Sequence, residues 1–256
     1  MTGPLLYRDY NREERALCFH LMRLLFTRID EVGDPRPVDD FLAALDPEYQ
    51  PGATGIDVLG EVALIRDAYH ARKEAPFELL DAIVELIREQ EGLQHVRPYT
   101  KLPEVLRDPR QTHPGQICRK ATSTGMQLSE HERLAYGALQ GMFNAKPDLA
   151  VVTPSTLYVV EAKFTEALDA TQLDRTRKIG EVWQKLLPAD LGYAEPPRLH
   201  VATLAASRYK PDMSWQQVVE MARRHLPAGD RSLLALERGL ALLQPEPEAQ
   251  PSPAEI

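Results

Sequence analysis

The chain has 256 residues, a formal net charge of −8, and 43% hydrophobic and 27% charged side chains. This length is enough for one large domain or two small ones, with a core that needs no disulfides or structural metal. The proportions are those of an ordinary soluble globular protein, and the acidic balance argues against a typical basic nucleic-acid-binding protein.

The two cysteines and the hydropathy pattern concern the cellular compartment. Cys18 and Cys118 are far apart in sequence and form neither a CxxC pair nor a disulfide framework, so we expect reduced thiols in a cytosolic protein. The chain opens with no signal-like segment and contains no run of about 18 apolar residues. We therefore expect a cytoplasmic protein with no membrane partner.

Charge is unevenly distributed along the chain. Residues 30–95 carry 16 acidic and 5 basic side chains. Residues 97–120 carry 2 acidic side chains and 6 basic ones, among them Arg107, Arg110, Arg119 and Lys120. A local positive surface of this kind can bind nucleic-acid phosphates even on an acidic chain. The alternative is a solvated loop with an excess of charge.

The first half of the chain reads as mainly helical. Apolar spacing predicts helices over 11–28, 57–73 and 77–91, and prolines between 35 and 51 predict turns and a short helix. The segment 97–127 is rich in Pro and Gly. It reads as mostly loop, with a short strand near 116–120.

From residue 128 the pattern becomes that of an α/β protein. We expect a helix over 130–143 capped by Ser129, strands over 148–153 and 157–164 joined by a turn, a helix over 169–187 and a strand over 198–205. Ser214 and Gln217 form a capping box for a helix to about 225, and Asp230 caps a last helix to 243. The Pro- and Glu-rich tail 244–256 is expected to be disordered.

The residues that carry chemistry are Asp148, Glu161 and Lys163. Alternate side chains of a strand share a face, so Glu161 and Lys163 point the same way. A turn at 153–156 lays the two strands antiparallel, which brings Asp148 near Glu161. Two carboxylates and one ammonium group then converge at a strand end.

Such a group suits phosphodiester hydrolysis with Mg²⁺ or Mn²⁺. Mg²⁺ takes one or two carboxylates and fills its remaining positions with water and substrate phosphate. The metal polarises the phosphoryl oxygen and activates water, and the lysine orients or deprotonates that water. The structural alternative is a surface hairpin with an ordinary Glu–Lys pair. The chain contains no GxxxxGK[ST], GxGxxG, HExxH or GxSxG motif.

Residues 128–209, with KPDLAVVTPSTLYVVEAKF and DATQLDRTRKIGEVW, resemble the core of the PD-(D/E)XK, or restriction-endonuclease-like, nuclease superfamily. The resemblance implies an α/β fold with a small mixed sheet flanked by helices, here with additional N- and C-terminal helices in one domain over 1–243. It implies that Asp148, Glu161 and the Ala162 carbonyl bind metal and that Lys163 is catalytic. Gln172 matches a glutamine often found on the following helix, and Arg175 could meet a phosphate.

The family usually adds an acidic residue from a preceding helix, and the sequence offers two. Glu14 lies on the leucine-lined face of the N-terminal helix, and its use would make 30–127 an insertion. Glu132 lies on the inner face of the helix before Pro147. For either residue the alternative is a partly buried glutamate paired with an arginine or lysine.

These features together predict a Mg²⁺-dependent nuclease acting on nucleic acid, with DNA as the expected substrate and defence or repair as its setting. A second interpretation is a nuclease-like fold that binds nucleic acid or protein without cutting. A third is an interaction protein in which the motif is accidental. DNA against RNA, and a homodimer or protein partner, stay open.

Overall fold

The computed structural model describes residues 13–30, 36–72, 76–164 and 169–243 of the chain, except for the side chains of Glu13 and Glu14. Its strands form one sheet in the order β1-β2-β3-β4-β5. Their bounds are Asp57–Gly60 (β1), Leu149–Val152 (β2), Thr156–Ala162 (β3), Arg198–Ala205 (β4) and Met213–Ser214 (β5). β4 and β5 are parallel, with Leu204 opposite Met213. The predicted α/β class with a small mixed sheet is confirmed.

The chain divides into two compact units, which are described separately. The first unit comprises Met1–Gly60, Val160–Leu168 and Ala202–Ile256, and the second comprises Glu61–Val159 and Asp169–Val201. The single domain predicted over 1–243 stays a prediction, and the tail 244–256 lies outside the described residues. Within the described part of the chain, no helix is long and apolar enough to cross a membrane.

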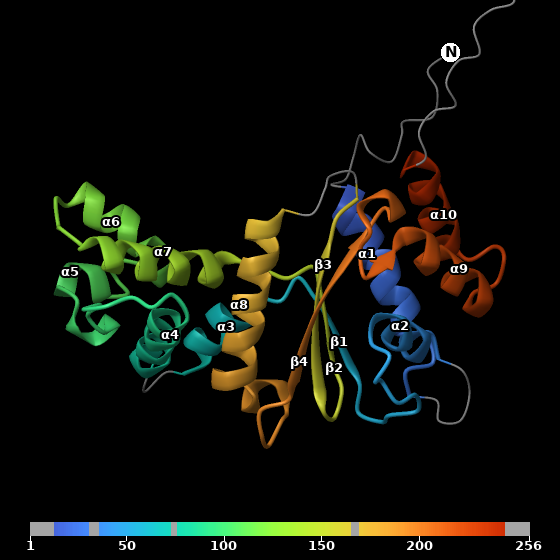
Figure 1. Cartoon of the computed structure of the whole chain (residues 1–256), viewed down its shortest axis with the longest axis horizontal. Coiled ribbons are helices and arrows are strands. Elements are labelled where there is room, and N and C mark those ends of the chain that lie inside the picture. The colour runs from blue at the N-terminus through green and yellow to red at the C-terminus, as the bar shows by residue number, and fades with distance from the viewer. Residues whose placement is uncertain (1–12, 31–35, 73–75, 165–168, 244–256) are drawn as a thin grey trace, which may run out of the picture. The chain divides into compact units, whose positions relative to one another are not determined.

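The first unit is built on the apolar face of its N-terminal helix. Its helices, grouped in Figure 1, are α1 (Glu13–Leu25), α2 (Pro37–Leu45), α9 (Trp215–His225) and α10 (Arg231–Leu243), with the 3-10 turn η5 (Ser207–Tyr209). Leu17, Leu21, Leu24 and Leu25 are all buried, as the apolar spacing predicts. α10 approaches α1 closely at Gly239, where a Cβ atom would lie 2.6 Å from Leu17 Cδ2. A larger residue at position 239 would therefore force the buried Leu17 side chain to move.

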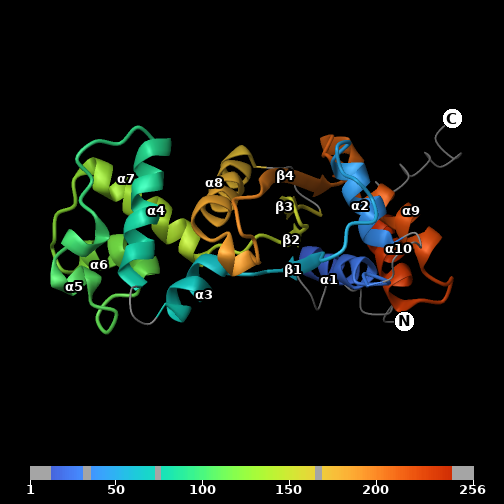
Figure 2. The same cartoon turned by 90° about the horizontal axis from the view of Figure 1, so that it is seen from below.

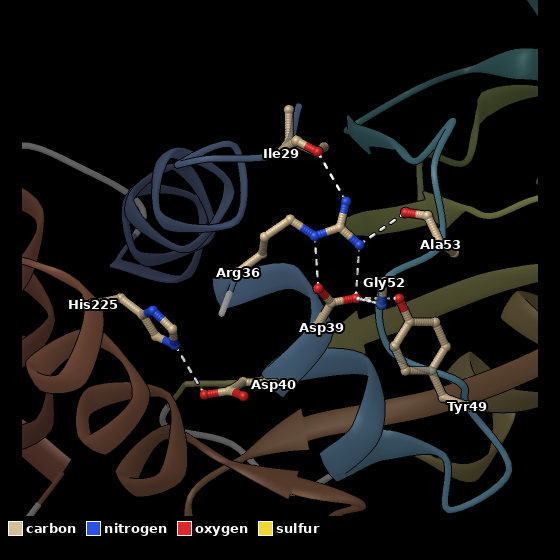
Figure 3. A network of polar contacts seen from close by, with 8 residues as sticks. All are labelled: Ile29, Arg36, Asp39, Asp40, Tyr49, Gly52, Ala53 and His225. Carbon is tan, nitrogen blue, oxygen red and sulfur yellow. Dashed lines mark hydrogen bonds and ion pairs between the residues drawn. The ribbon is translucent and has the colours of Figure 1, made fainter. Parts of the chain in front are cut away.

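A buried polar network ties α2 to the loop that follows it (Figure 3). The Asp39 carboxylate accepts hydrogen bonds from Arg36 Nε at 2.6 Å and Nη2 at 2.9 Å, from the Tyr49 hydroxyl at 2.6 Å and from the Gly52 amide at 3.1 Å. Burial alone would raise the pKa of Asp39, but the hydrogen bonds from Arg36 and Tyr49 outweigh it and lower that pKa. Both carboxylate oxygens of Asp39 have hydrogen-bond donors within the protein, so we interpret the network as one that stabilises the fold.

The second unit packs its helices around α4 and α7 (Figures 1 and 2). Its helices are α3 (Leu64–Ala71), α4 (Pro76–Gln90), α5 (Glu104–Arg107), α6 (Ile117–Ser123), α7 (Glu130–Asn144) and α8 (Ala170–Leu186). Three short 3-10 turns complete it: η2 (Tyr99–Lys101), η3 (Pro114–Gln116) and η4 (Ala189–Leu191). Ser129 caps α7 in a full capping box, and Asp169 caps α8. Both helix starts agree with the sequence prediction.

Two predicted elements are wrong. The helix expected over 57–73 is strand β1 followed by the shorter α3. β1 ends in Gly60, where a Cβ atom would lie 2.1 Å from Met22 Sδ, so the strand packs tightly against α1. The strand expected near 116–120 is η3 and α6. Ile117 and Ala121 are both buried, and their spacing of four is that of a helix face. The order helix, strand, strand, helix, strand expected over 128–209 is present as α7-β2-β3-α8-β4.

Candidate active site

The strand pair that carries the motif is joined by a turn closed by two threonines. The Thr153 amide donates to the Thr156 carbonyl at 3.0 Å, and the Thr156 amide donates to Thr153 Oγ1 at 3.1 Å. The Tyr193 hydroxyl donates to the same Thr156 carbonyl at 2.9 Å. Pro154 and Ser155 are the two residues between them, and Ser155 is exposed. The turn predicted at 153–156 is therefore confirmed.

Glu161 and Lys163 lie together at the end of β3, within the first unit. Every residue of β3 is buried, including Glu161. Lys163 Nζ lies 3.6 Å from Glu161 Oε1, and the two side chains are 12% and 7% exposed, respectively. The alternation of a strand places both on one face, as predicted. The result is a carboxylate and an ammonium group held side by side in a largely dry environment.

The backbone of Lys163 is fixed from two directions. Its amide donates to the Leu204 carbonyl of β4 at 2.7 Å. Its carbonyl accepts a 2.9 Å hydrogen bond from the indole Nε1 of Trp215, the first residue of α9. The ring of Trp215 also contacts that of Phe164, with centroids 6.4 Å apart. Sequence reasoning missed Trp215, because nothing in the local pattern links a helix-start tryptophan to a residue 52 positions earlier.

The other residues implied by the family resemblance lie in three places. Ala162 is the last residue of β3 and is buried. Asp148 is half-buried and directly precedes β2, in the second unit. Gln172 is half-buried and Arg175 is exposed, both near the start of α8. The structure thus brings Glu161 and Lys163 together, whereas Asp148, Gln172 and Arg175 join them only by proposal.

Glu132 has partners for both of its carboxylate oxygens. Oε2 accepts from the Ser129 amide at 2.8 Å and from Arg97 Nη2 at 3.0 Å, and Oε1 accepts from Arg97 Nε. The hydrogen bond from Arg97 lowers the pKa of Glu132, so the carboxylate is kept ionised as a helix cap and ion-pair partner. These contacts are those of the structural alternative for this residue. The side chain of Glu14 lies outside the described residues.

The basic residues of 97–120 are placed on the short helices and turns of the second unit. Arg110 and Arg119 are exposed, whereas Arg107 and Lys120 are half-buried. Arg107 Nε is a buried donor with no hydrogen-bond partner among the described residues. Arg97, by contrast, is engaged with Glu132. Arg97 is therefore set aside as structural, and the four positions named for nucleic-acid binding stay a prediction.

Among the described residues, no group of three or more His, Cys, Asp or Glu side chains could hold a metal ion. A Mg²⁺ site needs only one or two carboxylates, because water and phosphate complete its coordination.

Comparisons with models of known protein families, with curated proteins and with solved structures find no match for this chain.

Proposed function

We propose that the protein is a metal-dependent phosphodiesterase acting on nucleic acid, with DNA as the first substrate to test, and that its core is of the restriction-endonuclease-like type. The observation that carries this proposal is the Glu161–Lys163 pair at the end of β3. Burying charges is costly unless they are paired or bound to a ligand. A strand end that served packing alone would be better filled by apolar residues.

The burial of this pair, more than its separation, favours a chemical role: its side chains are 12% and 7% exposed, whereas the Lys185–Glu181 pair, with the same separation, has a lysine that is 50% exposed. The 3.6 Å separation of Lys163 Nζ from Glu161 Oε1 is longer than a good N–H···O hydrogen bond. The structural pair of Arg36 and Asp39 is instead bidentate, at 2.6 and 2.9 Å. Lys163 lies close enough to balance the charge of Glu161, and both groups are largely removed from solvent.

Asp148 enters the proposed site through the register of the hairpin. The Thr153–Thr156 pair closes the turn, and each step outward adds one residue on either strand. If this pairing continues five residues outward, Asp148 falls opposite Glu161, and opposite residues of an antiparallel pair share a face. The register thus supports a site of two carboxylates and one ammonium group.

The proposed roles follow from the chemistry of the groups. Asp148, Glu161 and the Ala162 carbonyl are the oxygen ligands that Mg²⁺ or Mn²⁺ prefers. Such an ion, when bound, polarises a phosphoryl oxygen and lowers the pKa of a bound water. Lys163 orients the attacking water and balances the charge that grows on the phosphate oxygens. Gln172 and Arg175 hold the substrate phosphate, and the basic residues Arg107, Arg110, Arg119 and Lys120 contact the nucleic-acid backbone.

The test is cleavage of labelled single- and double-stranded DNA and RNA by the wild type and by Lys163→Ala, with Mg²⁺, Mn²⁺, Ca²⁺ or a chelator. Lys163→Ala should lower turnover by about 10²- to 10⁴-fold, the usual worth of general acid–base assistance. Nucleic-acid binding should change little, because the lysine acts mainly in the transition state. Asp148→Asn and Glu161→Gln should lose metal binding as well as cleavage.

Lys185→Ala is the matched control for this experiment. Lys185 Nζ lies 3.6 Å from Glu181 Oε2, the same separation as in the proposed site, but its side chain is 50% exposed on α8. This variant should cut as the wild type does. Equal cleavage by Lys163→Ala, or cleavage that persists in chelator, would contradict the proposal. Salt-sensitive binding with no cleavage of any substrate would instead favour the non-cutting binding module.

A further inference from the structure

A pocket of about 370 Å³ opens in the first unit between η5, the start of α9 and the end of α10. This volume lies within the range of small-ligand sites. Its apolar wall includes Trp215, Leu240 and Leu243, and its polar lining includes Ser207, Arg208 and Gln216. An apolar wall with a few polar groups is the composition expected of a ligand site.

The pocket is connected to the backbone of Lys163 through one side chain. Trp215, which lines it, donates its indole hydrogen bond to the Lys163 carbonyl at 2.9 Å. The strand that leads into η5 is also fixed to the same residue, because the Leu204 carbonyl accepts from the Lys163 amide at 2.7 Å. A group bound here would therefore lie beside the backbone that positions the lysine.

Arg208 supplies a held cation to the lining of the pocket. Its guanidinium carbon lies 4.7 Å from the centre of the Tyr209 ring, and its Nη1 donates to the Leu243 carbonyl at 2.9 Å. These contacts restrict the guanidinium plane in advance. A restrained, planar guanidinium suits phosphate binding and stacking, because little side-chain freedom is lost when a ligand binds.

We propose that this pocket holds one nucleobase of the substrate strand, next to the phosphate that is cut. A base has flat apolar faces that fit against Leu240 on the apolar wall, which also includes the largely buried Trp215, and a polar edge that can meet Ser207 and Gln216. Its phosphate would meet Arg208. A lipid chain would not use the polar lining, and an acidic peptide would need more cations. The inference rests on the proposed function and names a substrate-binding subsite for it.

The test uses Trp215 as its own reporter. The chain has two tryptophans, and the other, Trp183, has a buried indole Nε1 with no hydrogen-bond partner among the described residues. Trp183→Phe therefore removes no such bond and leaves a single fluorophore. Oligodeoxyadenylate of four nucleotides, added in Ca²⁺ so that cleavage is suppressed, should quench Trp215 saturably. An abasic tetranucleotide with the same phosphates should bind more weakly and quench little.

Two substitutions in this background test the pocket directly. Ser207→Phe fills the pocket from an exposed position and should weaken oligonucleotide binding by roughly 5- to 100-fold, the range of one lost base stack. Arg208→Gln should weaken binding and reduce its salt dependence. Ser155→Phe, at the exposed turn between β2 and β3, is the control and should bind as the parent does. Circular dichroism verifies that each variant is folded.

The outcomes separate this inference from the proposed function. Quenching that is lost in Ser207→Phe supports the pocket even if no substrate is cut. Cleavage with unchanged binding and turnover in Ser207→Phe overturns the pocket and leaves the nuclease intact. No quenching by the oligonucleotide would also overturn the pocket proposal. Quenching by N-acetyl-tyrosinamide, added as a small model of a protein side chain, but not by the oligonucleotide would overturn it too and would assign the pocket to a protein side chain.

Discussion

Replacing Asp39 with asparagine should destabilise the first unit more than any surface substitution. The Asp39 carboxylate is the shared acceptor of the buried network in Figure 3, and Arg36 beside it is 2% exposed. The asparagine side chain would keep the shape of the aspartate but lose its negative charge. It would also turn one acceptor oxygen into a donor that faces other donors.

The size of the expected loss of stability depends on the hydrogen-bond partners that Arg36 keeps. Removing one partner of a buried ion pair costs about 3–5 kcal/mol, because the other charge is left uncompensated. Arg36 would keep hydrogen bonds to the Ile29 carbonyl at 3.0 Å and the Ala53 carbonyl at 2.8 Å. We therefore expect a loss near the lower end, about 3 kcal/mol. Tyr49→Phe removes one hydrogen bond to a charged acceptor and should cost about 1.5 kcal/mol.

Urea unfolding of these variants in the Trp183→Phe background measures the loss, because Trp215 then reports on the first unit alone. The double variant Arg36→Met/Asp39→Leu removes both charges and should cost less than Asp39→Asn. Glu237→Gln breaks the solvent-accessible Arg223–Glu237 pair between α9 and α10 of the same unit and should leave the midpoint unchanged. A loss in the free energy of unfolding below about 1 kcal/mol for Asp39→Asn would refute the reasoning. A loss for the double variant equal to the sum of the losses for its two single substitutions would refute it as well.

Three further predictions test other parts of the structure. Because the folded pKa of Glu132 is lowered from 4.5, its stabilising contribution is present above that pH and lost as the pH falls below it. Glu132→Gln should therefore flatten the acid limb of thermal stability, and an unchanged limb would contradict this. Gly239→Ala should destabilise by about 1 kcal/mol, because its Cβ would lie 2.6 Å from Leu17 Cδ2. Gly137→Ala, with nothing within 4 Å of its Cβ, should stabilise the second unit by up to about 1 kcal/mol in urea unfolding followed by circular dichroism. If the basic stretch binds nucleic acid, alanine at four positions should lower the slope of log binding constant against log salt by up to about 3.6, and an unchanged slope would mean that the stretch is a solvated loop. These positions are Arg107, Arg110, Arg119 and Lys120.

The elements that could be predicted are those whose signal is local. The predicted capping box of Ser214 and Gln217 is complete in the structure, and Ser129 caps α7 as predicted, with Glu132 completing a box there that was not predicted. β4 has the predicted bounds. The edge strands β1 and β5 have four and two residues, too few for an alternating pattern to be recognised. Strands this short are defined by the neighbours that pair with them, and no local pattern contains that information.

The same distinction separates the predicted and unpredicted parts of the candidate site. The shared face of Glu161 and Lys163 follows from strand alternation alone, and the structure has it. The ion pair of Glu132 with Arg97 could not be predicted from a local pattern. Arg97 is 35 residues away, and only the tertiary fold brings it to the start of α7. The acidic excess of 30–95 likewise gave no sign that Asp39 is buried against Arg36. Arg36 and Asp39 form a buried pair with two short hydrogen bonds, which is the geometry of a structural ion pair. The pair of Glu161 and Lys163 is buried at the end of a strand with a separation of 3.6 Å, and the proposed chemistry is to be tested there.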